Sequence, residues 1–176
     1  HLGPLSIADG ALLARRMLER RGYEISNENA MYLSSLVWGH PYYIYCVAES
    51  DFHEKGFPSE EDIKAVVEYE ITEGKIFGFW DAHFKEHEKE INGEGPSDVA
   101  RIGKKIVYYL VKYRDREVDV AEIARKLEVD EEVVIEKLNR LNQADLVNTY
   151  GLNYIGLKDP ILMRYIDLTY GSLVDA

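Results

Sequence analysis

The chain has 176 residues, one cysteine and a formal net charge of −11. An internal disulfide is therefore excluded, no apolar run reaches the roughly 18 residues that a membrane-spanning helix needs, and no signal-peptide pattern opens the chain. We expect a cytoplasmic protein without membrane contact. Because the first residue is His1 rather than Met, we also expect the chain to be part of a longer protein.

Negative charge is concentrated in the first half of the chain. Residues 1–96 carry 9 Lys and Arg against 18 Asp and Glu, a net charge of −9, whereas residues 97–158 carry 11 of each kind. Modules that bind a DNA duplex usually present a basic face to the phosphates. The distribution of charge therefore lowers the expectation of DNA binding without excluding it.

Capping and periodicity signals predict a helical bundle in the first half. Ser6 and Ser59 are each followed three residues later by an aspartate, as in a capping box, and Ser26 or Asn27 caps a helix between them. Gly74 interrupts the pattern. The expected helices cover residues 6–22, 26–38, a segment from Pro41 onward, 59–73 and 75–91.

Four arginines lie in the later turns of the first predicted helix, Arg15, Arg16, Arg20 and Arg21. Positive charge suits the carboxyl end of a helix, so a solvated face is the favoured interpretation. A contact with an acidic partner or a phosphate is the alternative.

A sharp corner between two helices is predicted at residues 38–41. Gly39 is typical of the position after a helix, and Pro41 is typical of the first position of a new one. Such a helix start presents backbone N–H groups that attract anions. Aromatic side chains surround the corner, and we interpret them either as core packing or as part of a binding site: Trp38, Tyr42, Tyr43 and Tyr45.

The clearest boundary is Asn-Gly-Glu-Gly-Pro at residues 92–96, which is dense in breakers and has no aliphatic or aromatic residue. We place the domain border there, with a helical bundle over residues 1–93 and a second domain over residues 94–176.

The second domain shows the element order of a winged helix-turn-helix. A helix over residues 98–113 is followed by a strand signal at 118–120, a helix at 121–128, a turn in which Asp130 caps a second helix, and two short strands around Gly151. A last helix is expected over residues 161–170. The predicted fold class is therefore mainly α, with a small β-hairpin as the wing.

The second helix of this motif is expected to expose side chains that can read base edges: Lys137, Asn139, Arg140 and Gln143. Lys158 is the one cation of the predicted wing. Glu131, Glu132 and Glu136 would repel phosphates nearby. DNA contact is one interpretation of this face, and a protein-facing or intramolecular role is the favoured one.

No catalytic or metal site is expected. The sequence has no G-x-x-x-x-G-K-[ST] phosphate loop, and Cys46 lies among apolar residues as a small buried side chain would. His83 and His87 have the spacing of two ligands on one helix face, but Phe84 replaces the glutamate of the zinc-protease motif, so a solvated face is favoured.

The run Trp-Gly-His-Pro-Tyr-Tyr-Ile at residues 38–44 lies inside the predicted bundle. A Pro-Ser-Glu-Glu-Asp helix start and then the winged helix follow it. This arrangement resembles the C-terminal half of archaeal-type ATPases of the AAA+/STAND superfamily, over about residues 2–158. In that family a P-loop ATPase core is followed by a helical lid and a winged-helix domain.

The resemblance implies that Gly39, His40 and Pro41 form the lid motif near the adenine of ATP, with Tyr42 and Tyr43 included by adjacency. The ATPase core is missing from this chain. The resemblance therefore also implies that ATP binds only together with an upstream ATPase domain of the same polypeptide, and that the chain alone is not an enzyme.

Two other hypotheses remain open. The chain could be a stand-alone winged-helix transcription regulator that binds DNA and whose bundle dimerises or senses a ligand, or it could be a protein-interaction scaffold. The sequence does not decide the partner, DNA binding or a homo-oligomeric state.

Overall fold

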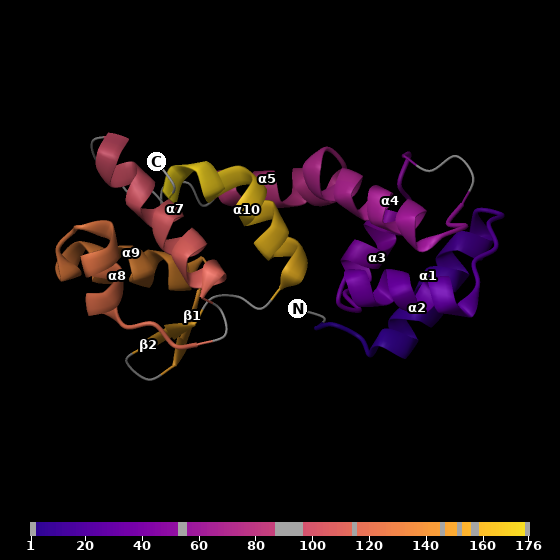
Figure 1. Cartoon of the computed structure of the whole chain (residues 1–176), viewed down its shortest axis with the longest axis horizontal. Helices are drawn as coiled ribbons and strands as arrows, with labels where there is room; N and C mark the ends of the chain where they lie inside the picture. The colour runs from indigo at the N-terminus through magenta and orange to yellow at the C-terminus, as the bar shows by residue number, and fades with distance from the viewer. Residues whose placement is uncertain are drawn as a thin grey trace. The chain divides into compact units, whose positions relative to one another are not determined.

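A computed structural model describes residues 3–52, 56–86, 97–113, 116–144, 147–150, 153–155 and 159–174, and these residues are mainly helical (Figure 1). The elements are α1 (Ile7–Arg20), α2 (Asn27–Leu36), α3 (Pro41–Ala48), α4 (Glu60–Thr72), α5 (Lys75–Glu86), α7 (Ser97–Lys112), α8 (Val120–Leu127), α9 (Glu131–Gln143), β1 (Asn148–Tyr150), β2 (Asn153–Ile155) and α10 (Pro160–Val174).

Contacts within the chain divide it into two compact units, His1–Phe79 and Trp80–Ala176. The division falls inside α5, so the first turns of this helix belong to the first unit and its last turns to the second. The border predicted at residues 93–94 lies outside the described residues and stays a prediction.

Serine side chains begin three helices of the first unit, as predicted. The Oγ atom of Ser6 accepts the Asp9 N–H at 3.1 Å, Ser26 accepts that of Asn29 at 3.1 Å, and Ser59 accepts that of Asp62 at 3.2 Å. These bonds satisfy amides that have no partner within the helix, and each fixes where its helix starts.

The first unit has its own apolar core. Helix α1 packs against α2 and α3, and α4 packs against the same two helices. Side chains with no or almost no exposed surface fill the space between them: Ala14, Leu18, Leu33, Ile44, Val47, Ile63 and Val66.

Gly39 is the point at which three segments of the first unit meet. Its N–H donates to the Ser34 carbonyl at 2.8 Å, and its own carbonyl accepts the Leu5 N–H at 2.9 Å. Its φ is +63°, and a Cβ atom added there would lie 2.3 Å from the Leu5 carbonyl oxygen. Both the backbone conformation and the close approach therefore require glycine.

The second unit is built around α7, which packs against α8, α9 and α10. The strands β1 and β2 pair antiparallel, with Thr149 opposite Tyr154. Buried side chains come from each of these helices: Ile106, Leu110, Ile123, Val134, Leu138, Leu162 and Ile166. The helices follow one another in the predicted order, α7, α8, α9 and α10.

The strand predicted at residues 118–120 is wrong in its extent. Val118 alone forms a bridge, and Val120 is already the first residue of α8. The Oδ1 atom of Asp119 accepts the Glu122 N–H at 2.6 Å, so this aspartate caps the helix. A capping aspartate between two valines starts the helix earlier than their β-branched side chains indicate.

Across the described ranges, no helix has both the length and the apolar character that crossing a lipid bilayer requires.

Gly39→Ala should destabilise the first unit more than Gly22→Ala. Gly22 also has a positive φ, +82°, but nothing lies within 4 Å of a Cβ added there. That control therefore introduces backbone strain alone, about 1–2 kcal/mol. Gly39→Ala adds the clash with the Leu5 carbonyl. Urea unfolding, followed by Trp38 fluorescence in a Trp80→Phe background, measures the loss in free energy of unfolding for each variant. Equal losses for the two variants would contradict the close approach of Gly39 to the Leu5 carbonyl.

Candidate functional site

The corner between α2 and α3 has the geometry of a fixed helix start. Trp38 and Gly39 both adopt left-handed backbone conformations, with φ of 55° and 63°, and α3 begins two residues later at Pro41. A left-handed tryptophan is strained, and such conformations persist only where surrounding contacts hold them. The bonds of Gly39 to Ser34 and Leu5 supply those contacts.

The start of α3 has no side-chain cap. His40 occupies the N-cap position, but its side chain makes no capping hydrogen bond. Pro41 has no N–H, and the following amides of a helix have no acceptor within the helix itself. The positive end of the helix dipole adds to these donors. An anion is therefore the kind of group that this helix start could bind.

The two tyrosines after Pro41 have different surroundings. The Tyr42 ring is partly exposed and lies 4.9 Å from the Phe79 ring, between centroids. The Tyr43 ring is 1% exposed and lies 4.5 Å from the His40 ring. The side chain of Tyr43 is thus part of the core, and only its backbone could reach a ligand.

Cys46 is confirmed as a small buried side chain. It has no exposed surface, and burial raises the pKa of its thiol to about 11, although a hydrogen bond with Tyr42 acts in the opposite direction. Burial likewise raises the pKa of the Tyr42 hydroxyl to about 12. The thiolate, which is the nucleophilic form of cysteine, is therefore disfavoured at neutral pH.

Glu70 was not singled out from the sequence, although it is 1% exposed. Its Oε2 atom accepts the Lys75 N–H at 2.6 Å across the Gly74 turn, and so it caps the start of α5. A Cβ added at Gly74 would lie 2.4 Å from that oxygen. The carboxylate and the glycine together fix how α4 leads into α5.

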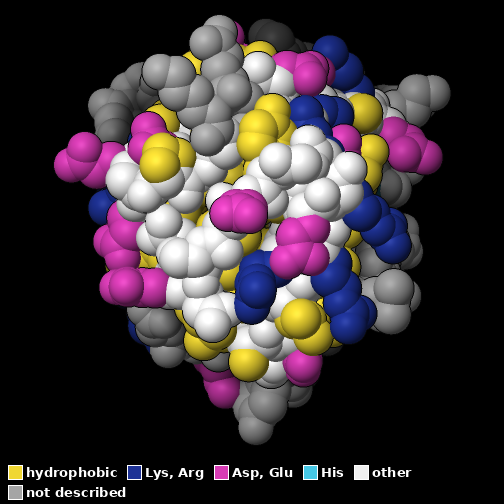
Figure 2. All heavy atoms as spheres, turned by 90° about the vertical axis from the view of Figure 1, so that its right-hand side faces the viewer, with side chains coloured by type: hydrophobic (Ala, Val, Ile, Leu, Met, Phe, Trp, Pro, Cys, Tyr) yellow, Lys and Arg dark blue, Asp and Glu magenta, His cyan; other side chains and the backbone are white. Residues whose placement is uncertain are grey.

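The arginines of α1 and its C-cap residue Arg21 do not form a uniform solvated face. Arg21 donates from Nη1 to the Ala48 carbonyl at 2.5 Å, and Arg15 bonds to the Asn27 side chain. Arg16 and Arg20 are exposed. Figure 2 views the side of the first unit that carries α1, α2 and α4, and it shows Lys and Arg side chains gathered with Asp and Glu side chains among them.

The surface of α9 differs from the predicted one at Lys137. This lysine is 2% exposed, and burial lowers the pKa of its ammonium group, so the prediction that it is exposed is wrong. The reason is helical spacing, because Lys137 shares the inward face of α9 with Val134, Leu138 and Leu141. The long aliphatic part of a lysine can pack on such a face.

The other predicted contact residues have varied surroundings. Asn139 and Gln143 are exposed, as predicted. Arg140 is partly exposed, and its Nη2 atom lies 2.9 Å from Glu136 Oε1, in an ion pair within the helix. Lys158 lies outside the described residues. The structure therefore leaves this face with fewer free cations than the sequence indicates.

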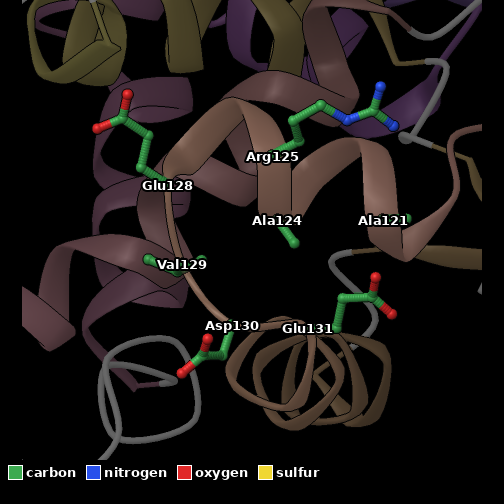
Figure 3. A pocket seen from close by; sticks show the side chains of 7 residues that line it. All are labelled: Ala121, Ala124, Arg125, Glu128, Val129, Asp130 and Glu131. Carbon is green, nitrogen blue, oxygen red and sulfur yellow. The ribbon is translucent and has the colours of Figure 1, made fainter.

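A hollow of about 610 Å³ opens between α8 and the start of α9 (Figure 3). Its apolar lining is Ala121, Ala124 and Val129, and the acidic side chains beside it are Glu128, Asp130 and Glu131. Asp130 is the N-cap of α9 as predicted, but its side chain makes no capping hydrogen bond. Arg125 also lines the hollow, and Figure 3 shows its guanidinium extending away from the other side chains.

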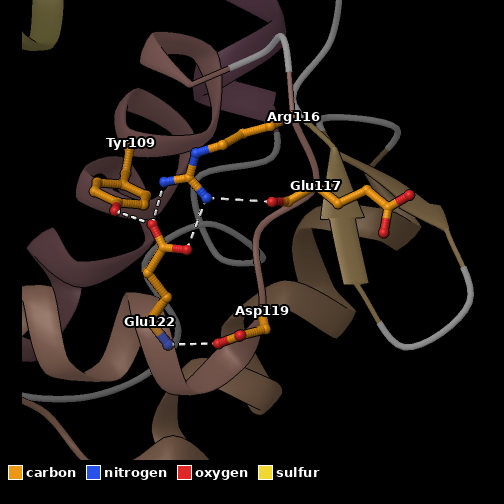
Figure 4. Close-up of polar contacts among 5 residues, drawn as sticks. All are labelled: Tyr109, Arg116, Glu117, Asp119 and Glu122. Carbon is orange, nitrogen blue, oxygen red and sulfur yellow. Dashed lines mark hydrogen bonds and ion pairs between the residues drawn. The ribbon is translucent and has the colours of Figure 1, made fainter.

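A clamp of side chains holds α8 against α7 (Figure 4). Glu122 Oε1 accepts the Tyr109 hydroxyl at 2.5 Å, and Glu122 Oε2 accepts Arg116 Nη1 at 2.8 Å. The bonds from Arg116 and then Tyr109 lower the pKa of the Glu122 carboxyl to about 2. Burial and the bond to Glu122 raise the pKa of the Tyr109 hydroxyl to about 12. The clamp thus fixes the helix that forms one wall of the hollow.

Metal binding finds no support within the described ranges, where no group of three or more His, Cys, Asp or Glu side chains is placed to hold an ion. His87, the second member of the predicted pair, lies outside those ranges.

Comparison of the chain with protein-family models, with curated proteins and with solved structures gave no match.

Glu122→Gln should remove a part of the free energy of unfolding that depends on pH. The folded-state pKa of about 2 is below the ordinary value of 4.5, so the carboxylate stabilises the fold above pH 4.5, and this contribution is lost as the pH falls towards 2. The difference in free energy of unfolding between wild type and variant should shrink over that interval. Urea unfolding followed by circular dichroism measures it, with exposed Glu132→Gln as the control. A difference in free energy of unfolding that stays the same as the pH falls would contradict the role of the Glu122 carboxylate in the clamp.

Proposed function

We propose that the chain is the lid and winged-helix region of an ATP-driven switch ATPase of the archaeal AAA+/STAND type. In this proposal a separate upstream domain holds the phosphates of ATP, and the corner at Gly39, His40 and Pro41 contacts the bound nucleotide. The elements α8, α9, β1 and β2 form the winged helix, which transmits the movement of the lid on nucleotide binding to a partner. The chain itself performs no chemistry.

One observation carries the nucleotide part of the proposal, the uncapped start of α3. The left-handed residues Trp38 and Gly39 fix where this helix begins, and the N-cap side chain leaves its first amides to an external acceptor. By contrast, Ser6, Ser26 and Ser59 cap the other helix starts of α1, α2 and α4. The start of α9 also has no capping side chain, but acidic residues occupy its first turn. Of these two helix starts, the one in the motif that resembles the family's lid is therefore the one suited to an anionic ligand.

The hydrogen bond between Leu5 and Gly39 gives this corner a mechanical role. Leu5 belongs to the segment that leads into α1, and its N–H is bonded directly to the Gly39 carbonyl at 2.9 Å. A nucleotide that displaced the corner would therefore also displace the segment before α1. Lids of this kind close on a ligand through small changes at a few backbone positions.

The surface of α9 favours a protein partner over DNA. Acidic side chains lie at its start, Lys137 is buried and Arg140 is paired with Glu136. Duplex binding needs cations that neutralise phosphates, and acidic side chains at the groove oppose it. The stand-alone transcription regulator is therefore the weaker proposal.

ATP should bind the isolated chain only weakly, and the chain should release no phosphate from ATP and Mg²⁺ above background. We expect dissociation constants above about 1 mM, since the domain that grips the phosphates is absent. Two-dimensional NMR of the labelled chain should show shifts at residues 39–43. The start of α4, capped by Ser59, is the internal control. Clear turnover, or no shift at about 10 mM ATP, would overturn the proposal.

A DNA duplex should not bind the chain at protein concentrations up to about 0.1 mM, where non-specific binders already associate. Fluorescence anisotropy of a labelled duplex at low salt measures this. Arg140→Ala and Arg16→Ala are the matched variants, one on α9 and one on α1. Binding that Arg140→Ala alone abolished would instead support a winged-helix regulator.

A further inference from the structure

We infer that the hollow between α8 and α9 is a docking site for a basic segment of a protein partner, one that inserts an aliphatic side chain beside an arginine or lysine. This docking site deepens the proposed function, and it rests on the part of that proposal in which the winged helix contacts a protein. It adds where the contact lies and the chemistry of the partner.

The shape of the hollow fits an inserted side chain. Ala121 and Ala124 are small residues of α8, and with Val129 of the turn they border an open, shallow hollow of about 610 Å³. Figure 3 shows the Ala124 side chain pointing from α8 into this space. Ile135 is 42% exposed and lies one helical turn after Glu131 on the same side of α9. One exposed apolar side chain therefore lies a helical turn along α9 from the hollow.

The charges around the hollow select the partner. The carboxylates of Glu128, Asp130 and Glu131 line it, and none of these three side-chain groups has a hydrogen bond or ion pair with the other described residues. Asp130 would ordinarily be occupied in capping α9, yet its carboxylate makes no capping bond. The Arg125 guanidinium extends away from these carboxylates (Figure 3).

Other occupants fit this surface less well. The phosphates of a nucleic acid are repelled by three carboxylates that outnumber the one cation of the lining, Arg125. A purely apolar segment would leave these carboxylates facing a low-dielectric contact without partners, which is costly. A basic segment with an aliphatic anchor satisfies both the apolar lining and the acidic rim, and charge complementarity of this kind fixes register and partner choice.

Two double variants test the role of charge at equal net charge. Asp130→Asn with Glu131→Gln removes two charges from the start of α9, and Glu60→Gln with Glu61→Gln removes two from the start of α4. The probe is a short fluorescein-labelled peptide of arginine and leucine, at about 0.05 M salt, where surface charges are little screened. Fluorescence anisotropy should show about tenfold weaker binding for the α9 variant and little change for the α4 variant.

A third variant tests the hollow without changing any charge. Ala121→Leu places a larger apolar side chain on the exposed surface of α8, where it fills the hollow and keeps the helix propensity high. It should also weaken binding, while circular dichroism shows an unchanged fold.

Three results would overturn the inference: no binding of the peptide, equal loss in both double variants, or unchanged binding by Ala121→Leu. Self-association of the chain that the α9 variant abolishes would assign the hollow to a second copy and overturn it too. These readouts are independent of the ATP titration, which concerns residues 39–43. Failure of one proposal therefore does not imply failure of the other.

Discussion

The close approach of two backbones at Gly39 is the constraint on which the first unit depends. Because no side chain separates Gly39 from the Leu5 carbonyl, the segment before α1, the end of α2 and the start of α3 are held at one point. The left-handed conformation of Trp38 and the proline-led start of α3 both follow from this arrangement. The same contact thus also fixes where the helix begins that we propose meets a nucleotide.

The second unit depends on a different kind of contact, the charged clamp at Glu122. Tyr109 of α7 and Arg116 both bond to this carboxylate, so one side chain of α8 sets the distance between the two helices. The α8 wall of the hollow is therefore held by polar bonds, whereas α9 is anchored by its buried apolar stripe and by the stem of Lys137. The acidic side chains at the start of α9 take no part in either anchor.

Local signals in the sequence predicted most of the fold, and tertiary contacts account for what they missed. The caps at Ser6, Ser26 and Ser59 depend on a few neighbouring residues, so the pattern alone identifies them. The burial of Lys137 depends instead on which face of α9 meets α7. The residue type alone predicts that a lysine is exposed, and this prediction is wrong there. For the candidate site, Gly39 and Pro41 could be predicted from the sequence because they are typical turn residues. The hollow beside Asp130 could not, because it exists only when α8 and α9 are placed side by side.

Helix α5 has a consequence for any attempt to study the halves separately. Its first turns pack in the unit that ends at Phe79, while Phe84, five residues on, stacks against Tyr165 of α10 with ring centroids 5.6 Å apart. A chain divided between the units would cut this helix in its middle, and each half would lose hydrogen bonds and buried aromatic surface. Dissection of the protein should therefore keep residues 75–86 on both pieces, so that each piece retains a complete copy of the shared helix.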